Sequence, residues 1–134
     1  MAKVTGIGGV FFKSRRDPKA LAAWYETHLG FKMEPWGGAV LNWTDDTAED
    51  KGLTVWHVAS PTTDWFAPSD APFMLNYRVD DLVALIADLR LAGVEVLKGP
   101  ESHENGKFAW IVDPEGNKVE LWEPKLWDEK NKEG

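Results

Sequence analysis

Leu75-Asn76-Tyr77-Arg78 leads into a helix-like run that ends at Gly93, and Val10-Phe11-Phe12-Lys13 leads into a similar run that ends at Gly30. Each half of the chain then closes on a β-forming stretch with an aromatic end. These stretches are Leu53-Thr54-Val55-Trp56 and Val119-Glu120-Leu121-Trp122. A repeated order of strand, helix and strands is typical of two similar modules, whose sheets can surround a common cleft.

The repeat predicts how the chain is divided. We expect one domain over residues 1–134, with a first module over 4–60 and a second module over 73–124. The stretch 61–72 carries three prolines and is expected to link the modules, and 125–134 is expected to form a polar tail.

Each module is predicted to hold one strand, a helix and then three strands. In the first half the expected strands are 4–13, 31–35, 39–43 and 53–58. In the second half they are 73–79, 94–97, 107–112 and 118–122. The first helix should begin after the capping residue Asp17 and stop at Gly30, and the second should be capped by Asp80 or Asp81 and stop at Gly93.

Composition limits the classes of function. The chain has no cysteine, which excludes disulfides, thiolate metal sites and cysteine nucleophiles. Its 15 Lys+Arg against 22 Asp+Glu argue against a nucleic-acid partner, because phosphate binding needs a basic surface. No apolar stretch approaches the roughly 20 residues of a membrane span, and the N-terminus shows no signal-peptide core, so we expect a cytoplasmic protein.

The 8 tryptophans are the most informative part of the composition. Tryptophan is bulky and usually needs a partner for its N–H group when it is buried. An excess of tryptophan therefore indicates either a large core or an aromatic cleft for a ligand.

Three stretches resemble the vicinal oxygen chelate superfamily, which includes glyoxalase I, bleomycin-resistance proteins, fosfomycin-resistance transferases and extradiol dioxygenases. They are Trp24-Tyr25 with Leu29-Gly30-Phe31, then Tyr77-Arg78-Val79-Asp80-Asp81-Leu82, and Asp113-Pro114-Glu115-Gly116-Asn117 with the strand that follows it. The resemblance runs from about residue 4 to residue 124. It implies an α+β fold of paired βαβββ modules, with a cup-shaped mixed sheet, helices on the outside and frequent homodimers.

The resemblance also implies where a metal would bind. Enzymes of this superfamily hold a divalent metal with side chains from the first and last strand of each module. These four positions fall at Gly9, Thr54, Met74 and Glu120. Because only Glu120 is a metal ligand and zinc enzymes use about three protein ligands, we expect neither the usual metal site nor another cofactor. His57 and His103 are the residues that could rescue a metal site from unusual positions.

Strand alternation predicts which side chains face the cup, because every second residue of a strand lies on the same face. The expected lining is Phe11, Lys13, Trp56, Met74, Asn76, Arg78, Glu120 and Trp122, with Trp43, Trp65 and Trp110 as further candidates. Two plainer alternatives stay open. The rings could simply fill the cleft, and Arg78 and Glu120 could pair with each other.

The leading hypothesis is a protein that binds a small aromatic and charged molecule in this cup without the usual metal. Lys13, Arg78 and Lys118 favour an anion, whereas the resemblance to bleomycin-resistance proteins favours a cation, so the sign of the ligand charge stays open. The alternative is an enzyme, either a glyoxalase-type lyase or isomerase, a dioxygenase or a thiol transferase. It would depend on a metal or use Glu120 as a general base.

Overall fold

The structure is a computed structural model that describes residues 7, 9–47 and 53–125. The start of the expected strand 4–13, the end of the acidic loop that precedes Leu53, and almost all of the expected tail 125–134 lie outside the described residues.

One mixed sheet organises the described part of the chain. Its strands are β1 (Leu75–Arg78), β2 (Val96–His103), β3 (Gly106–Val112) and β4 (Lys118–Pro124). Their order in space is β1-β4-β3-β2, with β1 parallel to β4 and the other two pairs antiparallel. The second half of the chain therefore forms a complete βαβββ unit, and the fold class is α+β as predicted.

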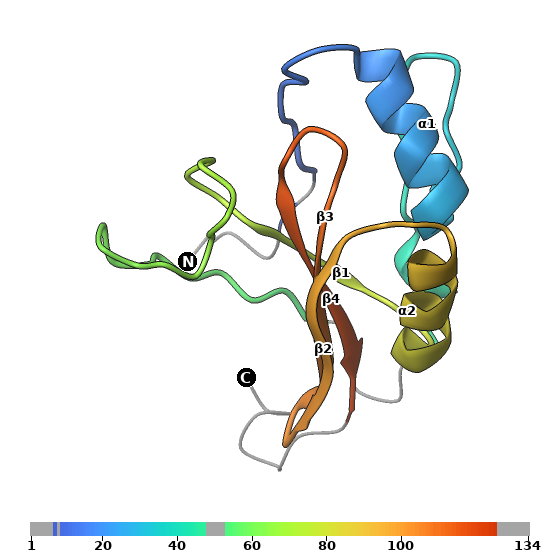
Figure 1. Ribbon diagram of the computed structural model, residues 1–134. Helices are drawn as coiled ribbons and strands as arrows, with labels where there is room; N and C mark the ends of the chain where they lie inside the picture. The colour runs from blue at the N-terminus through green and yellow to red at the C-terminus, as the bar shows by residue number, and fades with distance from the viewer. Residues whose placement is uncertain (1–6, 8, 48–52, 126–134) are drawn as a thin grey trace, which may run out of the picture.

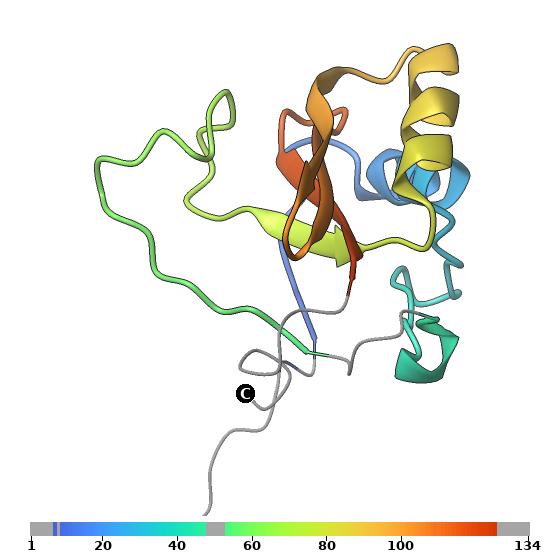
Figure 2. The ribbon, with the colours of Figure 1, turned by 90° about the horizontal axis from the view of Figure 1, so that it is seen from below.

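Both helices lie on one side of this sheet, and residues 53–72 pass along the other side (Figures 1 and 2). These helices are α1 (Pro18–Leu29) and α2 (Leu82–Leu91). No helix in the described ranges is long and apolar enough to cross a membrane.

The core lies between α2 and the sheet. Leu82, Ile86 and Leu89 recur at helical spacing on α2 and are fully buried against the face of the sheet that holds Ile111 and Leu121. These residues therefore form the apolar stripe of the helix. Tyr77 and Trp24 pack against the edge of the same cluster, which ties α1 to the second module.

Local chemistry fixes the ends of the helices. The side chain of Asp17 accepts hydrogen bonds from the backbone N–H groups of Lys19 and Ala20, and Gly30 follows the helix with a φ of 74°. Asp81 caps α2 by accepting from the N–H of Ala84. The predicted caps are therefore correct, and Asp81 rather than Asp80 serves as the second one.

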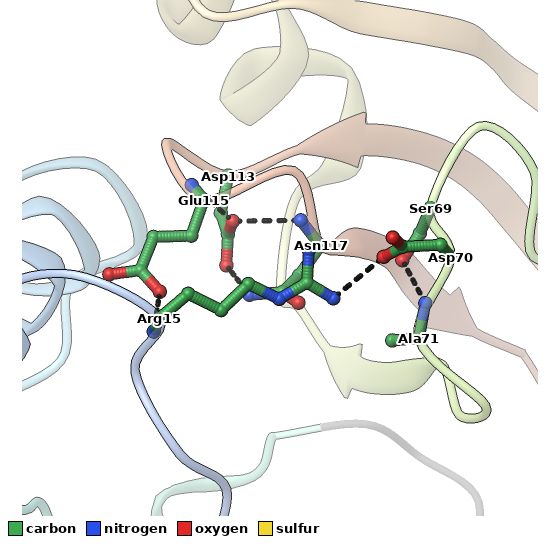
Figure 3. Close-up of polar contacts among 7 residues, drawn as sticks. All are labelled: Arg15, Ser69, Asp70, Ala71, Asp113, Glu115 and Asn117. Carbon is green, nitrogen blue, oxygen red and sulfur yellow. Dashed lines mark hydrogen bonds and ion pairs between the residues drawn. The ribbon is translucent and has the colours of Figure 1, made fainter.

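The turn between β3 and β4 holds the first half of the chain against the second (Figure 3). Asp113 accepts hydrogen bonds from two backbone N–H groups of its own turn and from the hydroxyl of Tyr25, at 2.8 Å. Glu115 accepts from the hydroxyl of Ser14 and from the N–H of Arg15, both at 2.5 Å. Both carboxylates are buried.

The first half forms fewer strands than predicted. Where strands 31–35 and 39–43 were expected, the described residues contain one isolated bridge, between Met33 and Ala39, and residues 9–13 and 53–58 form no strand. Alternation of apolar and polar residues indicates which side chains would share a face of a strand, but it does not provide a partner strand. A strand persists only where another strand accepts its backbone hydrogen bonds, and beyond this single bridge these stretches have no such neighbour among the described residues.

Strand β2 runs further than predicted. It continues through Gly99-Pro100 to His103, beyond the end of the expected strand 94–97, so His103 lies in a strand. The pairing with β3 shifts register between Lys98 and Glu101, which accommodates the glycine and the proline. A Cβ atom on Gly99 would lie 2.6 Å from the carbonyl oxygen of Phe108, so only glycine allows this close approach.

Candidate functional site

The sheet face opposite α2 carries aromatic and polar side chains in place of the aliphatic core. Paired residues of neighbouring strands share a face, so the pairs Asn76–Glu120, Trp110–Glu120 and Phe108–Trp122 lie together. We call this surface the aromatic face, defined by Asn76, Phe108, Trp110, Glu120 and Trp122. It lies on the side of the sheet along which residues 53–72 pass (Figure 1).

Three rings form a ladder across the aromatic face. Phe108 lies between Trp110 and Trp122, with ring centroids 6.3 Å and 5.8 Å away and interplanar angles of 13° and 9°. Trp122 is buried, and its indole N–H donates to the carbonyl of Asn105 at 2.9 Å. Phe108 and Trp110 are half-buried, so part of their ring surface faces solvent.

Glu120 lies beside this ladder and is held by two neutral donors. The amide nitrogen of Asn76 donates to one carboxylate oxygen at 2.6 Å, and the indole N–H of Trp110 donates to the other at 2.8 Å. Among the residues that the structure describes, no cation forms an ion pair with Glu120. The side chain is therefore fixed in position while its charge is not neutralised by a neighbour.

Arg78 lies at the other end of the ladder. Its guanidinium forms an ion pair with Asp46 and sits 5.3 Å from the centroid of Trp122. Asp46 follows the short 3-10 helix η1 (Trp43–Asp45), so a residue from the first half reaches the second module's sheet. The alternative that Arg78 pairs with Glu120 is not what the structure shows.

Two lysines border the same face. Lys118 donates to the backbone carbonyl of Trp65 at 2.7 Å, which attaches the stretch between the modules to β4. Lys98 lies 5.8 Å from the ring centroid of Trp110 and forms an ion pair with Glu101 at 2.9 Å.

The predicted site residues fall into two groups. Asn76, Arg78, Glu120 and Trp122 come together on one sheet face, and Met74 lies half-buried just before β1. Phe11, Lys13 and Trp56 are exposed, and within the described residues they make no hydrogen bond, ion pair or ring contact. Phe11 is 95% exposed and Trp56 is 77% exposed.

Phe108 and Asp46 are parts of this site that sequence analysis did not select, and Trp110 was only a further candidate. Phe108 and Trp110 alternate along a predicted strand, so pairing that strand with 118–122 would have placed both beside Glu120. No comparable signal exists for Asp46, because loop contacts do not follow a period.

The four positions at which the resemblance implies a metal do not fit one here. Gly9, Thr54 and Met74 supply no side chain of a usual ligand type. Within the described ranges, no three His, Asp or Glu residues lie close enough together to hold an ion. His57 packs its ring 5.3 Å from that of Trp65. His103 lies 3.1 Å from Glu101 and packs its ring 5.8 Å from that of Phe108.

Comparison with known proteins places this architecture in a family. The mixed sheet, the two helices on one face and the ring-lined opposite face define a fold of the glyoxalase and bleomycin-resistance type. The family model described as a glyoxalase-like domain matches residues 9–122. The chain therefore belongs to the glyoxalase-like domain family of the vicinal oxygen chelate superfamily. No curated protein matches the sequence.

Two solved structures share this fold, and a third is similar in sequence over less than half of this chain. A protein from the mobile metagenome of V. Pseudocholerae has a TM-score of 0.61 at 17% identity, over 92% of this chain and 97% of that chain. TnmS3, an antibiotic binding protein from Streptomyces sp. CB03234, has a TM-score of 0.50 at 25% identity, over 81% of this chain and 88% of that chain. Glyoxalase I of Leishmania major is 31% identical, with a TM-score of 0.35. The match covers 41% of this chain and only 37% of the length of that chain.

Proposed function

We propose that this protein binds a small aromatic and charged molecule on the aromatic face, without a metal at the positions that its relatives use. The observation that carries the proposal is the ladder of Trp110, Phe108 and Trp122 with the carboxylate of Glu120 beside it. Ligand sites typically combine many apolar and aromatic groups with a few well-placed polar ones.

The physical basis is ring stacking together with one oriented charge. An aromatic pair contributes about 1 kcal/mol beyond the apolar area that it buries. The Asn76 and Trp110 donors hold Glu120 in a single orientation, so the ligand does not have to order this carboxylate on binding. The likeness to TnmS3 supports the proposal, because that protein binds an antibiotic.

Equilibrium dialysis with 9-aminoacridine, a flat charged ring compound, tests the proposal. We expect saturable binding to the wild type and recovery of the compound unchanged, since a binder turns nothing over. Phe108→Ala and the bulkier Phe108→Leu should both weaken binding, by roughly fivefold, because each removes the central ring of the ladder.

Trp36→Ala is the matched control. Trp36 is 69% exposed on the turn after α1, so its loss should leave the affinity unchanged. Equal weakening by the Trp36 and Phe108 variants would contradict the proposal, as would a compound that is recovered chemically altered.

A further inference from the structure

We infer that the ligand of the aromatic face is a cation whose N–H group donates to Glu120. This inference rests on the proposed function and adds the sign of the ligand charge and the residue that recognises it. It follows from a comparison of charged side chains near the face. Arg78 and Lys98 are each paired with a carboxylate, whereas Glu120 is not paired with a cation among the described residues.

The cations around the face already have acceptors. Arg78 is paired with the carboxylate of Asp46, and Lys98 with that of Glu101. Lys118 donates to a backbone carbonyl of the stretch between the modules. Because each is paired with a carboxylate, Arg78 and Lys98 attract an anionic ligand less than unpaired cations would.

Glu120 differs from Arg78 and Lys98, which are paired with carboxylates, because both of its hydrogen bonds come from neutral donors. An ionised carboxylate has about four acceptor positions, so about two remain for a ligand. The side chain is half-buried, where a charge interacts more strongly than it does in open water. A flat cation with an N–H group supplies both the missing charge and the missing donor.

The ring ladder is compatible with a positive charge. Tryptophan faces attract cations, and Arg78 and Lys98 already lie at 5.3 Å and 5.8 Å from the centroids of Trp122 and Trp110. Each of these two cations is offset by its own carboxylate, so together they repel a cationic ligand less than two unmatched charges would.

Three compounds that share one ring system test the sign of the charge. In slightly alkaline buffer 9-aminoacridine is a cation, acridine is neutral and acridine-9-carboxylate is an anion. By titration calorimetry we expect 9-aminoacridine to bind roughly tenfold more tightly than acridine, the effect of one charge-assisted hydrogen bond, and acridine-9-carboxylate to bind most weakly.

Glu120→Gln keeps an acceptor for Trp110 but removes the charge. We expect this variant to lose most of the preference for 9-aminoacridine over acridine. Glu34→Gln removes one negative charge from the exposed turn after α1 and should keep the full preference. Unfolding curves of both variants confirm that they are folded.

The outcomes separate the two proposals. Equal binding of all three compounds, or an unchanged preference in Glu120→Gln, would overturn the inference about charge while the binding function stood. Tighter binding of acridine-9-carboxylate would reverse the sign. If none of the three compounds bound, the proposed function itself would fail.

Discussion

At the scale of single residues, polar groups inside the fold are matched by named partners. Asp113 is buried and accepts four hydrogen bonds, three within its turn and one from Tyr25, whereas Glu120 is half-buried and accepts two. Unpaired buried charge is costly, so structural carboxylates are usually saturated. This contrast between two acidic residues is the reason to assign packing to one and ligand binding to the other.

The two tyrosines give a prediction at this scale. Burial raises the pKa of Tyr77 to about 12, and burial together with the nearby Asp113 carboxylate raises the pKa of Tyr25 still further. At pH 10.0, the ordinary pKa of the side chain, we expect almost no tyrosinate in a spectrophotometric titration of the folded protein.

The sign of the linked stability follows from these raised pKa values. Folding keeps both phenols neutral, so their contribution to the free energy of unfolding is complete below pH 10.0 and falls as the pH rises through the folded values. If the folded protein at pH 10.0 gave half of the tyrosinate absorbance of the fully ionised side chains, the rings would not be buried as described.

At the scale of elements, sequence chemistry predicted the second module better than the first. The caps at Asp17 and Asp81 depend on neighbours a few residues away, and both were predicted from the sequence. Strand β2 extended past Gly99-Pro100 because a register shift absorbed these two residues. The strands of the first half depend on partner strands, which alternation cannot specify. More strands were therefore predicted there than the described residues form.

The turn after β3 gives a prediction for an element. Hydrogen bonds from Ser14 and from the backbone N–H of Arg15 lower the pKa of the Glu115 carboxyl. Glu115→Gln should therefore destabilise the protein near neutral pH, in urea unfolding curves, because it removes a charged acceptor.

The difference between wild type and Glu115→Gln should depend on pH. A lowered pKa stabilises the fold above the unfolded value of about 4.3, and this contribution is lost as the pH falls through the folded value. The two unfolding curves should therefore converge in acid. A constant difference across this range would show that the charge of Glu115 is not involved.

Gly99 gives a second prediction at this scale. Gly99→Ala should lower the free energy of unfolding by about 1–3 kcal/mol, since the backbone at this position has a φ of 98° and touches β3. Gly116→Ala is the control, because Gly116 also has a positive φ but has no atom within 4 Å of an added Cβ. Equal effects would mean that the close approach to Phe108 carries no cost.

At the scale of the whole molecule, the fold was predictable because a repeat limits the topology to few choices. The second module and the helices followed, and the face of Asn76, Arg78, Glu120 and Trp122 followed from alternation once the strands were placed. The contact of Asp46 with Arg78 and the exposed state of Phe11 and Trp56 did not follow. These features depend on how the first half meets the sheet, which no local period encodes.

The homodimer expected from the resemblance stays a prediction, and exposed apolar side chains of the first half favour it. Phe11, Trp43 and Trp56 are 95%, 83% and 77% exposed, and covering them with a second chain would remove apolar surface from water. Light scattering after size exclusion should give about twice 15.0 kDa. A mass of one chain at all concentrations would contradict the expectation.

The most direct test of the central claim is to record the indole N–H resonances of nitrogen-15-labelled protein while 9-aminoacridine is added. Trp110→Phe identifies the Trp110 signal, and Trp36→Phe identifies that of an exposed tryptophan away from the sheet. We predict that the Trp110 resonance shifts in proportion to bound compound while the Trp36 resonance stays in place, because the ligand reaches Glu120 beside Trp110. Binding that leaves Trp110 unmoved would contradict the account.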